Sequence, residues 1–261
     1  VYGNSRCNHS FLLDPLYTYS TTCAGQLELT MLAEEIQEEI PNANLLYGNT
    51  DGLTILLHKD TILKFQEICK NWEKLTGLLL EGYIKRDNDN EVIYKKLFLR
   101  DVNNYCAITK EGEVKLKGCF EKNKLLHKDP SARIIPIALE EYVVKGTAVE
   151  ETINNHNIIW DFLKRQKFKS DSHGAYYSMK NGKEIIEKAE KVARYFIATR
   201  ETGKIFMKHY PKSDKESALE KGFLCHEDQI IKDENAFNYD INRKYYILES
   251  YKIINAVENK K

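Results

Sequence analysis

The sequence predicts an α+β protein, and three observations carry that prediction. A segment with helical periodicity runs from Ser20 to Ile40, an apolar hairpin pattern follows from Asn44 to Leu57, and β-rich runs lie between Leu78 and Phe120. Candidate helices dominate the rest of the chain. Strand-rich sequence followed by helix-rich sequence is typical of the α+β class.

The length and net charge of the chain limit the classes of function that are possible. The 261 residues suffice for one large domain or two modest ones. Because 39 basic and 39 acidic side chains cancel, nucleic-acid binding would have to use a local basic surface. No apolar run approaches the ~18 residues that span a bilayer, and no signal pattern is present. We therefore expect a cytoplasmic protein with no membrane partner. The start at Val1 suggests a piece of a longer protein or a mature fragment of one.

The six cysteines include no CxxC pair. This usage favours reduced, semi-buried thiols over a disulfide set, and it makes a zinc site an unfavoured alternative.

The first half of the chain contains two expected helices around the hairpin. In the segment from Ser20 to Ile40, apolar side chains recur at helical spacing, and Pro41 and Asn42 end the pattern. Asp60 is expected to cap a second helix that extends to about Lys74. Its apolar stripe consists of Ile62, Phe65, Ile68, Cys69 and Trp72.

Four strands are expected next, with the sequences LLLEGYI, VIYKKLFLR, VNNYCAIT and EVKLKGCF. The polar clusters RDNDNE and KEGE mark turns among them. In the last strand Val114 and Leu116 alternate with Lys115 and Lys117, so one face of that strand is basic.

The remainder is expected to be helix-rich. PIALEEYVVKG, VEETINNHNIIWDFLKRQ and EIIEKAEKVARYF are the helical candidates, and FIATRETGKIFMKHY suggests a hairpin with Thr202 and Gly203 at its turn. A boundary near Glu121 to Lys128 divides the chain into domains 1–121 and 122–261.

The hairpin from Asn44 to Leu57 has the polar cluster GNTDG between its two apolar runs. Asn, Asp and Gly are common turn residues, so this cluster has a purely structural explanation. The functional alternative is that the turn holds Asp51 rigidly as a ligand of Mg²⁺, a hard cation that binds carboxylate and phosphate oxygens.

The order of several motifs resembles the C-terminal part of a family-B DNA polymerase of the bacteriophage type. VYGNS at Val1 to Ser5 is similar to the end of the family's second polymerase motif. LLYGNTDGLTI is similar to the third motif, usually written with Asp-Thr-Asp. YKKLFLRDVNNYCAI occupies the place of the Lys-x-Tyr element that contacts the primer strand. The likeness covers the chain in order, with sharp motifs only in the first half.

The resemblance implies a partial palm over 1–121, an antiparallel sheet with a metal-site hairpin and packed helices, followed by a helix-rich thumb over 122–261. It implies that Asp51 is the catalytic metal ligand in a two-Mg²⁺ site. Tyr2, Gly3, Asn49 and Thr50 would belong to the nucleotide site. The family's other metal-binding Asp and the Lys of its second motif lie upstream of this chain. The upstream part of the same polymerase is therefore an expected partner, and the isolated piece is expected to be inactive.

Two departures from the family pattern concern these motifs. Asn49 replaces the usual first Asp of the third motif, and an amide brings no charge to a metal site. Asn103 replaces the Lys of the primer element, with Tyr105 as the matched position.

Primer–template DNA and a dNTP are the expected ligands. Between Lys95 and Lys128 nine Lys or Arg side chains stand against four acids. Such a surface is either solvated or contacts phosphates without reading sequence, and the resemblance favours phosphate contact. The expected DNA-binding residues are Lys95, Lys96, Asn103, Asn104, Tyr105, Lys115 and Lys117, with Lys164, Arg165 and Lys167 in the second cluster.

Two other functions remain open at this point. One is a non-catalytic nucleic-acid-binding module or degenerate polymerase, which Asn49 and Asn103 favour. The other is a palm-type nucleotide cyclase, which the basic β-rich region disfavours because a cyclase has no duplex to hold.

Overall fold

The structure is a computed structural model that describes residues 2–49, 52–83, 93–122, 132–180, 182–199, 202–231 and 239–259. The chain divides into two compact units, one of residues 1–95 and 109–113 and one of residues 96–108 and 114–261. Helices and antiparallel sheets alternate along it, so the predicted α+β class is confirmed.

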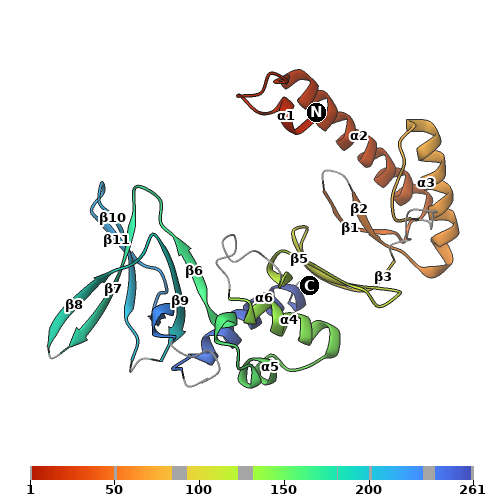
Figure 1. The fold of residues 1–261 in the computed structure, drawn as a ribbon. Helices are drawn as coiled ribbons and strands as arrows, with labels where there is room; N and C mark the ends of the chain where they lie inside the picture. The colour runs from red at the N-terminus through yellow and green to blue at the C-terminus, as the bar shows by residue number, and fades with distance from the viewer. Residues whose placement is uncertain are drawn as a thin grey trace. The chain divides into compact units, whose positions relative to one another are not determined.

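The first unit consists of helices around one hairpin (Figure 1). Its elements are α1 (Tyr2–Ser5), α2 (Pro15–Glu39), β1 (Asn44–Gly48), β2 (Leu53–Leu56) and α3 (Ile62–Thr76). The long helix begins five residues before the predicted start, because the Asp14 carboxylate accepts a hydrogen bond from the Tyr17 amide at 2.9 Å and Pro15 occupies the first turn. At the end of α3, Gly77 adopts φ of +74°, which glycine tolerates without a Cβ clash.

Two local predictions in this unit are wrong. Asp60 does not cap α3; it lies in the 3-10 turn Lys59–Thr61, where its carboxylate is 3.0 Å from His58 Nδ1. The stretch LLLEGYI does not form a strand over its described residues 78–83. There the Glu73 carboxylate accepts hydrogen bonds from the Leu80 amide at 2.7 Å and the Tyr83 hydroxyl at 2.8 Å, so helix contacts replace strand pairing.

The other three predicted strands are confirmed as β3 (Tyr94–Asp101), β4 (Asn104–Thr109) and β5 (Val114–Lys117), in one sheet of that order. Strands β4 and β5 pair antiparallel. The 3-10 turn Gly118–Phe120 follows, and Phe120 is fully buried against Phe98.

The second unit also contains three helices, α4 (Ile134–Lys145), α5 (Val149–Asn155) and α6 (Arg243–Glu258). Helix α4 confirms a prediction, whereas α6 was not anticipated. The long helix predicted from residue 149 ends already at Asn155, and a 3-10 turn at Ile159–Phe162 and strand β6 (Lys164–Lys167) follow it.

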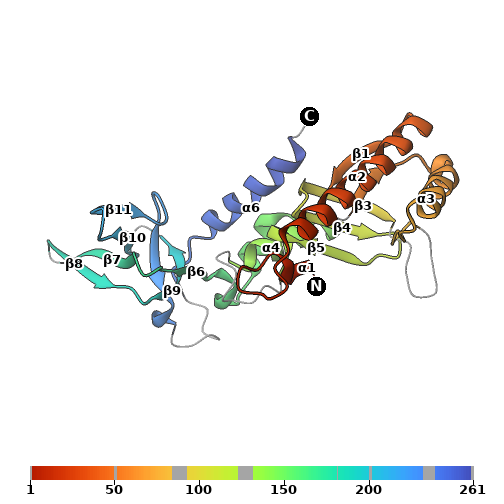
Figure 2. The same ribbon diagram turned by 90° about the horizontal axis from the view of Figure 1, so that it is seen from above.

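Two further antiparallel sheets belong to the second unit, where a helix-rich part was expected (Figures 1 and 2). One has the order β11-β10-β7-β8 and the other the order β12-β9-β6. Their bounds are β7 (His173–Lys180), β8 (Lys183–Lys188), β9 (Val192–Ala198), β10 (Ile205–Tyr210), β11 (Lys215–Ala218) and β12 (Leu224–Glu227). The described part of residues 122–261 is therefore mixed, and the expectation of a helix-rich region is wrong.

The segment EIIEKAEKVARYF illustrates why the helix-rich prediction is wrong. It forms β8 and the start of β9, not a helix, although its apolar residues fall at helical spacing. Strand pairing with β7, β6 and β12 supplies its backbone hydrogen bonds, and tertiary pairing of this kind overrides a local pattern. The hairpin predicted around Thr202 is also wrong, because β9 and β10 belong to different sheets.

Each unit has its own apolar core. In the second unit, helix residues such as Ile134, Leu139 and Tyr246 pack with sheet residues such as Phe196 and Phe206 in one continuous cluster. In the described residues, no helix is both long enough and apolar enough to cross a membrane.

Candidate nucleic-acid interface

The hairpin β1–β2 carries the sequence that resembles a polymerase metal site. Gly48 pairs with Leu53, and the Asn49 amide donates to the Gly52 carbonyl at 2.9 Å, which closes a four-residue turn. A Cβ on Gly48 would lie 3.1 Å from Leu53 Cδ2, so the two strands approach closely just before the turn. The predicted hairpin is thus confirmed, and its turn is narrow.

The hairpin rests on a platform made by α2 and α3. Leu53, Ile55 and Leu57 pack against a buried cluster that includes Ile36 of α2 and Ile68 of α3. A hydrogen bond fastens the two helices together, because the fully buried Trp72 donates its indole N–H to the Glu28 carbonyl at 2.9 Å. Side chains placed on rigid elements of this kind hold their geometry better than side chains on free loops.

Of the residues predicted for catalysis and nucleotide binding, the structure describes only some. Asn49 is exposed beside the turn. Asp51 and Thr50 lie outside the described residues. Tyr2 and Gly3 belong to α1, which is joined to α2 by a hydrogen bond of 2.7 Å between the hydroxyls of Ser5 and Thr18.

The sheet β3–β4–β5 has one basic face, as its alternation predicts. Tyr105 lies opposite Lys117 and Ala107 lies opposite Lys115, so these side chains share one face. On the other face Val114 and Leu116 pack against the core of the second unit. Tyr105, Lys115 and Lys117 are half-buried.

The two asparagines at the primer-contact position have different roles. Asn104 is structural: its Nδ2 donates to the Asp101 carboxylate at 2.8 and 3.0 Å, and its Oδ1 accepts from the Cys119 amide at 2.8 Å. Asn103 is exposed, with its backbone amide bonded to Asp101 Oδ1 at 3.0 Å. The side chain of Asn103 therefore faces solvent, whereas that of Asn104 fixes the turn.

Two of the predicted DNA-binding lysines have internal partners. Lys96 donates to the Val143 carbonyl at 2.7 Å, near the C-terminal end of α4, where a cation complements the helix dipole. The Lys164 ammonium bonds the Glu220 carboxylate and the Tyr245 hydroxyl, and the exposed fractions of the Lys164 and Glu220 side chains are 18% and 10%. These contacts indicate structural roles. Lys95 and Lys96 are both exposed on β3, and of the two only Lys96 has its ammonium bonded to a backbone carbonyl within the described residues.

The second predicted basic cluster lies on a strand. Arg165 and Lys167 of β6 occupy one face, and Lys167 is exposed. Arg194 of β9 lies directly opposite Arg165 and is also exposed. Arg194 was missed because its segment was interpreted as a helix; period-two alternation with the buried neighbours Ala193 and Tyr195 could have identified it.

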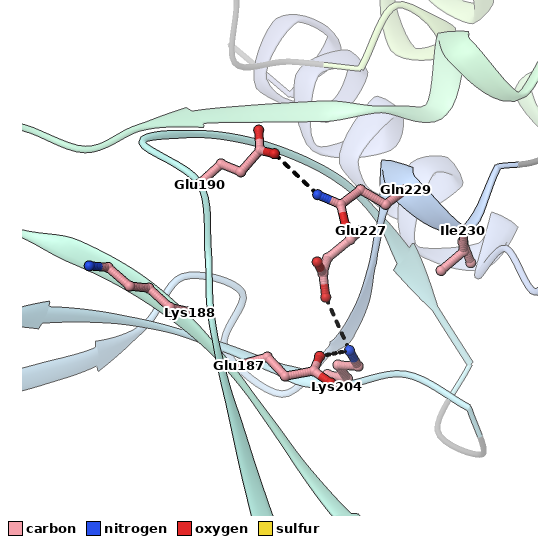
Figure 3. Close-up of a pocket in the computed structure, with 7 residues that line it drawn as sticks. All are labelled: Glu187, Lys188, Glu190, Lys204, Glu227, Gln229 and Ile230. Carbon is pink, nitrogen blue, oxygen red and sulfur yellow. Dashed lines mark hydrogen bonds and ion pairs between the residues drawn. The ribbon is translucent and has the colours of Figure 1, made fainter.

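A polar cavity of about 460 Å³ lies among Glu187, Lys188, Glu190, Lys204, Glu227, Gln229 and Ile230 (Figure 3). Lys204 pairs with Glu187 and, at 3.1 Å, with Glu227, while Glu190 accepts from Gln229 at 3.2 Å. Burial acts to lower the pKa of Lys204, but the two carboxylates outweigh it and raise that pKa. These mutual pairings engage most of the charged groups in the cavity.

The sequence CHED at Cys225 to Asp228 lies largely in strand β12, with Cys225 fully buried. His226 Nε2 lies 2.9 Å from the Thr202 hydroxyl, which also bonds the Asp240 carboxylate. Burial lowers the pKa of His226. Asp240 and Thr202 approach the same ring nitrogen, whereas a hydrolytic triad needs the acid and the nucleophile on opposite nitrogens.

All six cysteines are free, as predicted, and Cys69, Cys106 and Cys225 are buried. Burial raises the pKa of the Cys69 thiol to about 12 and that of Cys106 to about 11. Neither is therefore a thiolate nucleophile near neutral pH.

Asp51 and Asn49 have side-chain oxygens of the kind that hard cations bind, and Asp51 lies outside the described residues. Within the described part of the chain, no three His, Cys, Asp or Glu side chains gather to hold a metal ion. No protein-family model matches this sequence, and no curated protein matches it either.

Proposed function

We propose that this chain forms the metal-site hairpin and part of the primer–template surface of a template-directed DNA polymerase. The observation that supports this most is the hairpin β1–β2. Asp51 lies between its two strands in the sequence, and the strands are packed on two helices joined through Trp72 and Glu28.

In the proposed reaction the primer 3′-hydroxyl attacks the α-phosphate of a dNTP, and a new O–P bond forms. The bond between the α-phosphorus and the oxygen that bridges it to the β-phosphate breaks, and pyrophosphate leaves. Mg²⁺, when bound, supplies Lewis-acid stabilisation of the attacking and leaving oxygens. Asp51 holds its share of the metal site from the hairpin turn, and a carboxylate upstream of this chain completes the site. Tyr2, Gly3 and Thr50 belong to the nucleotide side.

The basic face of the β3–β4–β5 sheet positions the primer–template. Lys115 and Lys117 contact phosphates, and Tyr105 lies directly across from Lys117 on the same face. Contacts of this type hold any sequence, as a replicating enzyme requires. Lys95 and the exposed Asn103 extend this surface, whereas Lys96 bonds the Val143 carbonyl and Asn104 fixes the adjoining turn. Six free thiols support a cytoplasmic setting.

Primer extension tests the proposal in the full-length protein that contains this chain. With Mg²⁺ and dNTPs the protein extends a primer, and the Asp51→Ala variant binds primer–template without extending it. The isolated 261-residue chain binds DNA and incorporates no nucleotide, because its metal site lacks the second carboxylate. Incorporation by the isolated chain would contradict that assignment.

Asn49 favours a second candidate, a non-catalytic nucleic-acid-binding module. An amide in place of a carboxylate weakens metal binding, as in a polymerase that has lost activity. Under this alternative the full-length protein binds primer–template, never extends it, and is indifferent to Asp51→Ala.

A further inference from the structure

At the β6 end of the β12–β9–β6 sheet, one face presents a compact set of outward-facing cations, whereas Phe196 farther along β9 on the same face is buried. Arg165 and Arg194 are directly opposed across strands β6 and β9, and Lys167 lies on the same face, two residues along β6. The neighbouring positions Lys164 and Tyr195 point to the other face, where both contact Glu220. The three outer cations are therefore separated from the core network by the sheet itself.

This arrangement costs stability unless an anion compensates it. Directly opposed residues of an antiparallel pair have Cβ atoms about 5 Å apart, and like charges at that spacing repel. Within the described residues, no carboxylate lies within ion-pair distance of Arg165, Lys167 or Arg194. Arg194 does act at longer range on Asp228: burial raises the pKa of that carboxyl, and Arg194 partly offsets the rise.

The chemistry of the face fits phosphate groups on a duplex. Guanidinium groups bind phosphate oxygens through paired N–H donors. Two arginines whose Cβ atoms lie about 5 Å apart across a strand pair can both reach one phosphate. In the described part of this sheet no aromatic side chain is exposed. Because unpaired bases are held largely by stacking on aromatic rings, the face suits a double-stranded backbone better than a single strand.

We propose that Arg165, Arg194 and Lys167 form a phosphate-binding surface for duplex DNA, with Arg194 as a contact residue of its own. The inference rests on the proposed function, since a polymerase must hold the duplex that it produces. It adds a second surface to the β3–β4–β5 face, and it assigns to each a separate set of phosphate contacts.

Fluorescence anisotropy on the 261-residue chain with a labelled duplex tests this surface. The variant Arg165→Ala/Arg194→Ala removes two charges from the face. Lys183→Ala/Lys215→Ala is the matched control, because it removes two exposed charges from the β11-β10-β7-β8 sheet. Thermal unfolding of all three proteins verifies that each is folded.

Loss of a shared phosphate contact reduces the slope of log K against log salt by about 0.9 and weakens binding by about tenfold or more at low salt. The loss should be equal on two duplexes of unrelated sequence, and the control should bind like the wild type. Equal affinities for wild type and the arginine variant would overturn the inference, as would an equal loss in the control. If the surface instead binds an acidic protein, the arginine variant would bind the duplex as tightly as the wild type does, and the inference would be wrong.

The same variants separate this inference from the proposed function. If the full-length protein extends primers but the arginine variant binds duplex normally, the surface assignment is wrong and the polymerase assignment stands. If the arginine variant loses duplex binding but the full-length protein extends no primer, the surface stands and the polymerase assignment is wrong.

Discussion

Replacement of Lys164 by methionine should destabilise the second unit without affecting DNA binding. The Lys164 ammonium bonds Glu220, and Glu220 also accepts hydrogen bonds from Tyr195 at 2.8 Å and Tyr245 at 2.9 Å. With 18% and 10% of the two charged side chains exposed, this ion pair is largely shielded from water. Methionine keeps the aliphatic volume of the lysine and removes only the charge and its donors.

The magnitude follows from what remains around Glu220. Removal of one partner of a buried ion pair typically costs about 3–5 kcal/mol, because the other charge stays buried. Two tyrosine hydroxyls still donate hydrogen bonds to the Glu220 carboxylate, and each bond stabilises the remaining charge by about 1 kcal/mol. We therefore expect a loss of about 1–3 kcal/mol in the free energy of unfolding, or roughly 2–12 °C in Tm for a unit of this size.

Urea unfolding followed by circular dichroism measures this loss, and Lys167→Met is the matched control on the same strand. Because Lys167 is exposed, its substitution should change the free energy of unfolding by less than about 0.5 kcal/mol. The double variant Lys164→Met/Glu220→Leu should recover part of the loss, since it leaves no unpaired buried charge. An unchanged stability in Lys164→Met, together with weaker duplex binding, would refute the structural role and return Lys164 to the DNA surface.

Three further predictions concern the two units. Trp72→Phe removes the indole hydrogen bond to the Glu28 carbonyl and should cost the first unit about 1–3 kcal/mol in urea unfolding; an unchanged midpoint would show that the helices are not fastened there. Gly118→Ala places a Cβ 2.1 Å from the Asn103 carbonyl at a φ of +66°, so Tm and duplex affinity should both fall, with a loss of about 2 kcal/mol or more. A wild-type Tm in that variant would show that the turn has room for a side chain. The Cys69 pKa of about 12, above its ordinary value of 9.0, means that the folded state keeps a proton that the unfolded state loses. Stability should therefore fall as pH rises from about 9 to 12, by up to about 1.4 kcal/mol per pH unit from this thiol, and Cys69→Ala should lessen the fall.

The sequence allowed the first unit and the β3–β4–β5 sheet to be predicted in most respects. Helices α2 and α3 have apolar residues at helical spacing and end at Pro41 and Gly77. The turn residues between Gly48 and Leu53 indicated the hairpin, and the alternation of valine, leucine and lysine in β5 indicated its two faces. Local signals suffice in these elements because each one buries a single regular face.

The centre of the second unit could not be predicted in the same way. Residues 184–196 are rich in Glu and Lys, and their apolar residues recur at three- and four-residue spacing. They form strands because β7, β6 and β12, which are distant in sequence, provide their hydrogen-bond partners. Long-range pairing leaves little trace in a short window of sequence.

The candidate site shows the same limit at the level of side chains. Lys96 and Lys164 were predicted to bind DNA because they are basic and lie in basic stretches of the sequence. Their actual partners, Val143 and Glu220, are 47 and 56 residues away along the chain, so nothing in the nearby sequence indicates them. Arg194, in contrast, was not predicted as a DNA contact, because its exposed position depends on strand β9 and a helix was expected there. Charge in a sequence therefore identifies candidates, and only the fold separates phosphate contacts from internal ion pairs.

The most direct test of the central claim is primer extension by the full-length protein that contains this chain, measured beside its Asp51→Ala variant with primer–template binding monitored in both. The account predicts that the wild type extends the primer and that the variant binds DNA with unchanged affinity but adds no nucleotide. Extension at the wild-type rate by Asp51→Ala would contradict the assignment of the hairpin as half of a metal site.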